Sequence, residues 1–77
     1  MMTTVFDVNM NLAKQKTYRK GWSLSELAKQ ANLSLNTIFA LQAKRRRASE
    51  RTVYKLANAL DVSPAEIIEK AYELQKK

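Results

Sequence analysis

Apolar residues in the middle of this chain recur every three or four positions, as they do on the buried side of an amphipathic helix. Two segments carry a full stripe at this spacing: Leu24, Leu27, Ala28 and Ala31 in the first, and Val53, Leu56, Ala57 and Leu60 in the second. Between them, Ile38 and Leu41 mark the buried side of a third helix. We find no run with the strict alternation that is typical of a strand. The pattern therefore predicts an all-α fold.

Capping residues define where five helices begin. Serines stand directly before four of them: Ser23, Ser34, Ser49 and Ser63. A serine at this position accepts a hydrogen bond from a free N–H of the first turn, and Glu26 and Glu66 complete two capping boxes. With a first helix that starts near Asp7 or Asn9, we expect helices over about 9–19, 24–31, 35–43, 50–60 and from 64 onward.

The second and third predicted helices are joined by a tight turn. Asn32 can adopt the positive φ that such a turn requires, and Gly21 can do the same after the first helix. Two short helices connected in this way form a helix-turn-helix pattern. Four consecutive cations, Lys44 to Arg47, follow the third helix directly and indicate a polyanionic partner.

The C-terminal segment is expected to be helical. Ile67, Ala71 and Leu74 lie at helical spacing, so residues 69–77 are interpreted as an extension of the fifth helix and residues 1–6 as a flexible N-terminus. Residues 1–77 would then form a single domain, a compact five-helix bundle. The apolar stripe of the last helix either covers the first helix or pairs with a second chain, giving a homodimer through the C-terminal helix.

The chain contains no cysteine and no histidine, which excludes several kinds of chemistry. Disulfides, thiolate nucleophiles, zinc clusters of the usual type and imidazole bases are all excluded, which argues against an enzyme, a metal site or a cofactor. No apolar run approaches the roughly 20 residues that span a bilayer, and residues 1–11 lack the features of a signal peptide. We expect a cytoplasmic protein that does not contact membranes.

The net charge of +7 is concentrated in the middle of the chain. Residues 14–55 carry eleven basic and two acidic side chains, whereas residues 56–77 carry three basic and four acidic ones. A strongly cationic region of this kind is typical of a domain that docks one face on phosphates. The alternative is a cationic surface that serves only solubility.

Over about residues 21–68, the chain resembles the Cro and phage-repressor type of helix-turn-helix domain. Three motifs carry the resemblance: Gly21-Trp22-Ser23-x-x-Glu26-Leu27-Ala28, Leu33-Ser34-x-x-Thr37-Ile38 and Leu56-Ala57-x-Ala59-Leu60-x-Val62-Ser63. The resemblance implies a bacterial or phage transcriptional regulator, often a repressor, that places its third helix in the major groove of an operator as a dimer. Lys44 stands where the family usually has glycine and Ala48 where it usually has proline, so the third helix either ends there or continues through the arginines.

The outward side of the third helix supplies the candidate base-reading residues, Leu35, Asn36, Phe39 and Ala40. In one interpretation Asn36 hydrogen-bonds an adenine while the three apolar residues contact thymine methyl groups. In a second, Leu35 and Phe39 form an apolar patch that binds another protein, as in an antirepressor or antitoxin. A third places Phe39 inside the bundle.

The candidate phosphate-binding residues are hydroxyls and cations around this helix: Ser23, Ser25, Lys29, Ser34, Lys44, Arg45, Arg46 and Arg47. Hydroxyls at helix starts lie beside free backbone N–H groups, which favour anions. The cations would position the domain on double-stranded DNA. A nucleoid-type protein that binds DNA without sequence preference would use the same residues.

Overall fold

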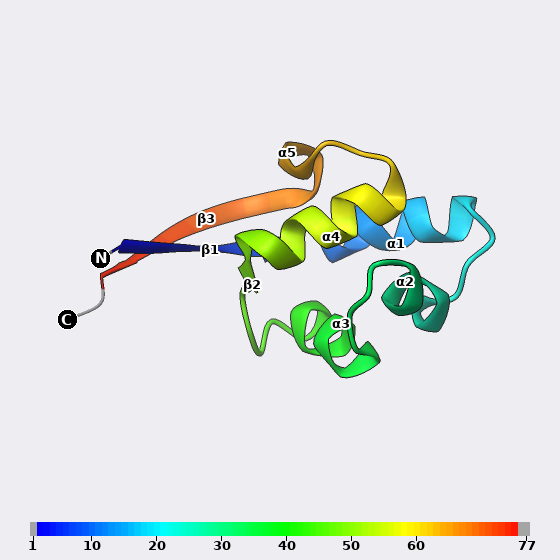
Figure 1. The fold of residues 1–77 in the computed structure, drawn as a ribbon, viewed down its shortest axis with the longest axis horizontal. Coiled ribbons are helices and arrows are strands. Elements are labelled where there is room, and N and C mark those ends of the chain that lie inside the picture. Colours follow the sequence, from blue (N-terminus) through cyan, green and yellow to red (C-terminus); the bar gives the residue numbers. More distant parts are fainter. Residues whose placement is uncertain (1, 76–77) are drawn as a thin grey trace.

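The computed structural model describes residues 2–75 of the chain (Figure 1), so Met1 and the last two residues of the expected C-terminal extension lie outside the described residues. The described part contains five helices and three strands. In chain order these are β1 (Met2–Val8), α1 (Met10–Arg19), α2 (Leu24–Gln30), α3 (Leu35–Gln42), β2 (Ala48–Ser49), α4 (Glu50–Leu60), α5 (Pro64–Ile67) and β3 (Ile68–Gln75).

One hydrophobic core joins the helices to the inner part of the sheet. Its buried apolar residues are Val8, Met10, Ala13, Leu27, Ala28, Ala31, Ile38, Leu41, Ala48, Val53, Leu56, Ala57, Leu60 and Ile67. The inward positions predicted for α3 and α4 are confirmed, because Ile38, Leu41 and the whole stripe of α4 belong to this core. Burial of these side chains is the main favourable contribution to the stability of so small a domain.

The predicted helix starts are confirmed by their hydrogen bonds. The hydroxyls of Ser23, Ser34 and Ser49 accept the backbone N–H groups of the residues three positions later, at oxygen–nitrogen distances of 3.1–3.2 Å. Asn9 caps α1 through the N–H of Leu12 at 3.2 Å. These caps satisfy donors that have no partner inside a helix, and they fix where each helix begins.

Each of the helices α1 to α4 is followed, within two residues of its end, by a residue with left-handed backbone. These residues are Gly21 (φ 75°), Asn32 (57°), Lys44 (61°) and Asp61 (56°). After α3, the N–H of Lys44 donates to the carbonyl of Leu41 at 3.2 Å, and the N–H of Arg45 donates to the carbonyl of Ala40 at 2.9 Å, which is a Schellman motif. Helix α3 therefore stops before the arginines.

The prediction of an all-α fold is wrong, because both ends of the chain are strands. β1 lies at the centre of a three-stranded antiparallel sheet of order β2-β1-β3. Residues 2–6, expected to be a flexible N-terminus, belong to β1, and α5 is a single turn instead of the start of a long helix. At Ile68 the backbone becomes extended (φ −87°, ψ 123°), and β3 runs where the helical extension was expected.

Pairing between the two chain ends explains this difference. Phe6 lies opposite Ala71 and Thr3 opposite Leu74, partners that are separated by almost the whole sequence. The N–H of Asn9 also donates to the carbonyl of Ile67 at 2.8 Å and joins the two segments where they leave the sheet. Short apolar runs fit a helix or a strand, and the partner decides between them. A helix over residues 69–77 would leave β1 without the hydrogen bonds of this ladder.

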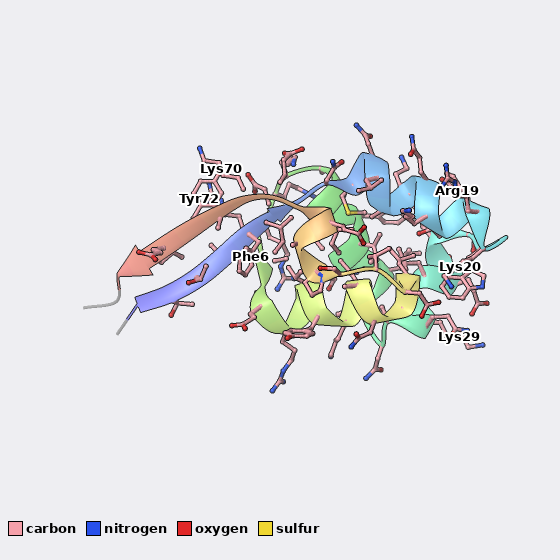
Figure 2. All side chains as sticks on the ribbon, turned by 90° about the horizontal axis from the view of Figure 1, so that it is seen from above. Phe6, Arg19, Lys20, Lys29, Lys70 and Tyr72 are labelled. Carbon is pink, nitrogen blue, oxygen red and sulfur yellow. The ribbon has the colours of Figure 1, made fainter. Side chains whose placement is uncertain are left out.

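The outer part of β1 and β3 extends away from the helices as a two-stranded ribbon (Figure 1) and lengthens the molecule to 43 × 23 × 18 Å. Phe6 lies next to the helices, whereas Tyr72 and Lys70 lie together on the ribbon (Figure 2). Ala71, Glu73 and Leu74 of β3 are exposed. The ribbon thus has one end anchored in the core and one end in solvent.

The left-handed backbone of Lys44 leads to a prediction about stability. Lys44→Gly and Lys44→Ala both remove the side chain, but only glycine adopts a positive φ without a steric cost. We expect the free energy of unfolding to be about 1 kcal/mol higher for the glycine variant than for the alanine variant. Urea denaturation of both proteins measures this difference. A glycine variant that is less stable than the alanine variant would contradict the observed end of α3.

Candidate nucleic-acid interface

Helices α2 and α3 lie side by side on the opposite side of α4 from α5 (Figure 1). The packing of Ile38 (0% exposed) and Leu41 (3%) turns the other side of α3 toward solvent. There Asn36 is exposed, Phe39 is 43% exposed, and Ala40 is half-buried. Phe39 therefore does not pack into the bundle.

Leu35 differs from the other outward residues of α3. It is half-buried and packs against the core, so part of its side chain is already covered by the protein. The surface that α3 offers to a partner is consequently centred on Asn36 and Phe39, with Ala40 beside them.

An open hollow borders the start of α3 and the loop that follows this helix. It is lined by Ser34, Asn36, Thr37, Ala40, Arg45 and Arg46. The Schellman motif directs the loop back along α3 and brings two guanidinium groups near the polar start of the helix. Hydroxyl, amide and guanidinium groups around one hollow form a surface suited to an anionic ligand.

Thr37 also lines the hollow, although it was not among the residues expected from the sequence to bind DNA. Its hydroxyl lies 2.8 Å from that of Ser34, and its N–H is the donor that Ser34 caps. Its position three residues after a capping serine is a signal that could have identified it.

The four cations after α3 do not act as one group. Arg45 and Arg46 line the hollow, whereas Lys44 and Arg47 contact the sheet. The Nζ atom of Lys44 lies 3.0 Å from Oε1 of Glu69, and the Arg47 guanidinium lies 4.0 Å above the ring of Tyr72. The sequence could not reveal these contacts, because Glu69 and Tyr72 belong to a segment that was expected to be helical.

The candidates at the start of α2 form a separate area. Ser23, Ser25 and Lys29 are exposed, and the Ser23 hydroxyl already accepts the N–H of Glu26. Lys29 lies with Arg19 and Lys20 at the end of the molecule opposite the ribbon (Figure 2). These residues do not line the hollow beside α3.

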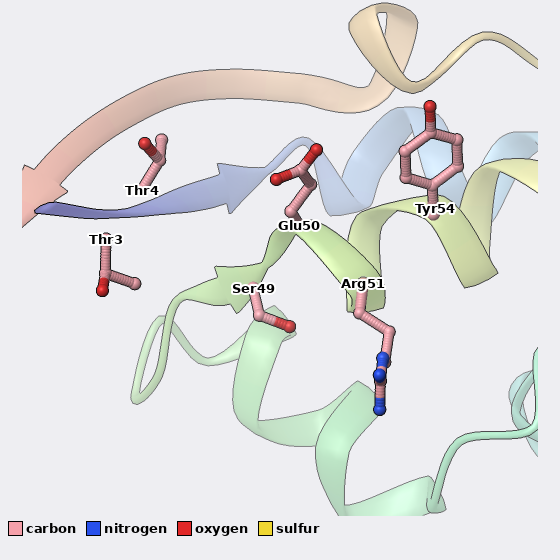
Figure 3. Close-up of a pocket in the computed structure, with 6 residues that line it drawn as sticks. All are labelled: Thr3, Thr4, Ser49, Glu50, Arg51 and Tyr54. Atoms are coloured by element: carbon pink, nitrogen blue, oxygen red, sulfur yellow. The ribbon is translucent and has the colours of Figure 1, made fainter. Parts of the chain in front are cut away.

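A second hollow lies between β1 and the start of α4, lined by Thr3, Thr4, Ser49, Glu50, Arg51 and Tyr54. The two threonines point to opposite faces of β1, and Arg51 points away from Glu50 and Tyr54 (Figure 3). These side chains do not converge on a common point. Within residues 2–75 we find no group of three or more Asp and Glu side chains that could hold a metal ion, and no helix long and apolar enough to cross a membrane.

Five helices around one core, with α2 and α3 joined by a tight turn and one side of α3 exposed, define a helix-turn-helix protein. Residues 15–67 match the helix-turn-helix family model of the Cro/C1 type, so the chain belongs to this family. No curated protein sequence shows significant similarity to the chain.

Two solved structures are similar to this one. The restriction-modification controller protein C.AhdI from Aeromonas hydrophila is 30% identical, with a TM-score of 0.64 over 70% of this chain and 82% of that chain. The hypothetical transcription factor NHTF from Neisseria is 28% identical, with a TM-score of 0.68 over 75% of this chain and 67% of that chain. Together with the family match, these similarities support a DNA-binding transcription regulator.

Proposed function

We propose that this protein is a sequence-specific transcriptional regulator of prokaryotic or phage type that places α3 in the major groove of an operator. The observation that carries the proposal is the hollow beside α3, where the exposed Asn36 lies next to Arg45 and Arg46. A protein that reads DNA needs groups for base edges and cations for the adjacent phosphates, and this arrangement supplies both.

The base contacts would come from the outward side of α3. The Asn36 amide can donate to and accept from the edge of an adenine, and the side chains of Phe39 and Ala40 can contact thymine methyl groups. Leu35 would add a smaller contact, because part of its surface is covered by the core. These few contacts would read only a short stretch of each half-site.

The phosphate contacts would come mainly from Arg45 and Arg46, supported by the hydroxyl of Ser34. Ser23, Ser25 and Lys29 would contact the backbone farther along the groove. Lys44 and Arg47 are half-exposed in their contacts with the sheet, so they add to the local positive potential without having to touch a phosphate.

The protein would occupy its operator as a homodimer. A dimer through a C-terminal helix has no basis in the described residues, because β3 runs where that helix was expected. We place the contact instead at the outer edge of β3, which has no partner strand within residues 2–75. A two-stranded ribbon is marginally stable alone, and an antiparallel pairing of β3 with a second copy is compatible with two-fold symmetry.

A second candidate function rests on Phe39. An exposed aromatic side chain on a surface helix is a common anchor for protein partners. If Phe39 serves in this way, the protein is an antirepressor or antitoxin on the same fold.

Selection of bound sequences from a random duplex pool tests the proposed function. We expect enrichment of a motif with two-fold symmetry, because a dimer presents two copies of α3 to successive half-sites. Sequencing the bound fraction measures the enrichment. A pool that stays unstructured would indicate a protein that binds without sequence preference, and a pool without bound DNA would favour the protein-binding function.

The affinity for DNA should depend strongly on salt. With about six to ten phosphate contacts per dimer, we expect affinity to fall about 10³-fold to 10⁵-fold between 50 and 200 mM salt. Arg45→Ala with Arg46→Ala should make this dependence less steep, whereas the charge-matched pair Lys14→Ala with Lys16→Ala on α1 should leave it nearly unchanged. Fluorescence anisotropy at a series of salt concentrations gives the slopes. Equal slopes for the two double variants would contradict the assigned roles of Arg45 and Arg46.

Variants of Asn36 and Phe39 distinguish the two candidate functions. If α3 reads bases, Asn36→Ala should lose about 1–3 kcal/mol of discrimination at one operator position and keep its affinity for scrambled duplex. Phe39→Ala should then affect mainly a thymine position. Binding of both variants to the selected operator and to scrambled duplex provides the measurement. Wild type and variants that bind both duplexes equally would exclude the base-reading function.

A further inference from the structure

Arg47, Tyr72 and Asp7 form one connected cluster between the loop after α3 and the sheet. The Arg47 guanidinium lies 4.0 Å above the ring of Tyr72, and its Nε atom lies 3.7 Å from Oδ1 of Asp7. The Tyr72 hydroxyl donates to the other carboxylate oxygen, Oδ2, at 2.8 Å. Asp7 therefore contacts Arg47 and also the hydroxyl of the tyrosine on whose ring Arg47 stacks.

The same loop is attached to the sheet at two further points. Lys44 pairs with Glu69 of β3 at 3.0 Å, and Ala48 pairs with Phe6 across the ladder between β2 and β1. Arg45 and Arg46 lie between these attachments and have no ion pair within the described residues. Arg45 and Arg46, which line the hollow beside α3, are therefore preceded and followed in the chain by residues that attach the loop to the sheet and do not line the hollow.

The cations of the loop therefore differ in role: Lys44 and Arg47 attach the loop to the sheet, and Arg45 and Arg46 line the hollow. An exposed ion pair alone fixes a side chain weakly. Here the Arg47 guanidinium contacts both the face of the Tyr72 ring and the Asp7 carboxylate, and the side chain of Asp7 is only 20% exposed. Such combined contacts restrict Arg47 to one position far better than a single surface pair does.

We propose that Asp7 and Tyr72 are positioning residues for DNA binding. By holding Arg47 on the sheet, they fix the path of the loop and present Arg45 and Arg46 beside α3. The inference rests on the proposed function, and it assigns to β1 and β3 an indirect role in recognition, through Arg47 and the loop, although neither strand belongs to the helix-turn-helix. Preorganisation of this kind improves affinity because the loop is already ordered before DNA arrives.

The test compares variants of the cluster with matched controls on the selected operator. Asp7→Asn should lower operator affinity about tenfold relative to Asp61→Asn, which removes the same charge from the end of α4. Tyr72→Leu should cause a similar loss relative to Tyr54→Leu, a change at an exposed tyrosine of α4. Tyr72→Phe keeps the stacking face and should retain most of the affinity. Thermal unfolding verifies that each variant is folded at the temperature of the binding assay.

Two further measurements distinguish positioning from a merely structural role. In the Arg47→Ala background, Asp7→Asn should cause no additional loss, because the group that it holds is already absent. Amide hydrogen exchange of the free protein should be faster at Arg45 and Arg46 in Asp7→Asn than in Asp61→Asn. Asp7→Asn that binds and exchanges like its control would overturn the proposal. If the wild type binds neither duplex, the proposed function fails, and the exchange data alone still decide whether the cluster orders the loop.

Discussion

The antiparallel ladder between β1 and β3 is the constraint on which the arrangement of this domain depends. It joins the first strand of the chain to the last and places both against the same core that the helices share. Through β2 and the contacts of Lys44 and Arg47, the ladder also reaches the loop after α3. The helix-turn-helix is therefore supported on one side by α1 and α4 and on the other by a sheet built from the chain ends.

The helices could be predicted from the sequence because their determinants are local. A capping serine, an apolar stripe and a residue suited to a positive φ lie within a few positions of each other at α2 and α3. The outward side of α3 followed from the same information, since the burial of Ile38 and Leu41 leaves Asn36 and Phe39 exposed. Lys44 shows the limit of such signals: a lysine occupies a backbone conformation that usually indicates glycine.

The sheet could not be predicted because its determinants are distant from each other. Residues 68–75 alternate imperfectly, and Ile67, Ala71 and Leu74 also fit a helical stripe, so only the presence of β1 selects the strand. The different roles of the cations after α3 could not be predicted for the same reason. Arg45, Arg46 and Arg47 are adjacent and chemically identical, and what distinguishes Arg47 is a tyrosine that lies 25 positions later in the chain.

The pairing of the chain ends also bears on how the domain folds. Thr3 and Leu74 become neighbours only when about 70 residues between them form a closed loop, at an entropic cost of about 4 kcal/mol in a simple chain model. Contacts between helices that are neighbours in the chain, such as α2 and α3, close much shorter loops at a lower cost, so they can form before the ribbon closes. Because Lys44 and Arg47 contact β3, we expect the loop after α3 to become fully ordered only when the C-terminal strand pairs with the first one. A short covalent bridge between the two ends would remove much of this cost and make closure nearly as fast as the local steps.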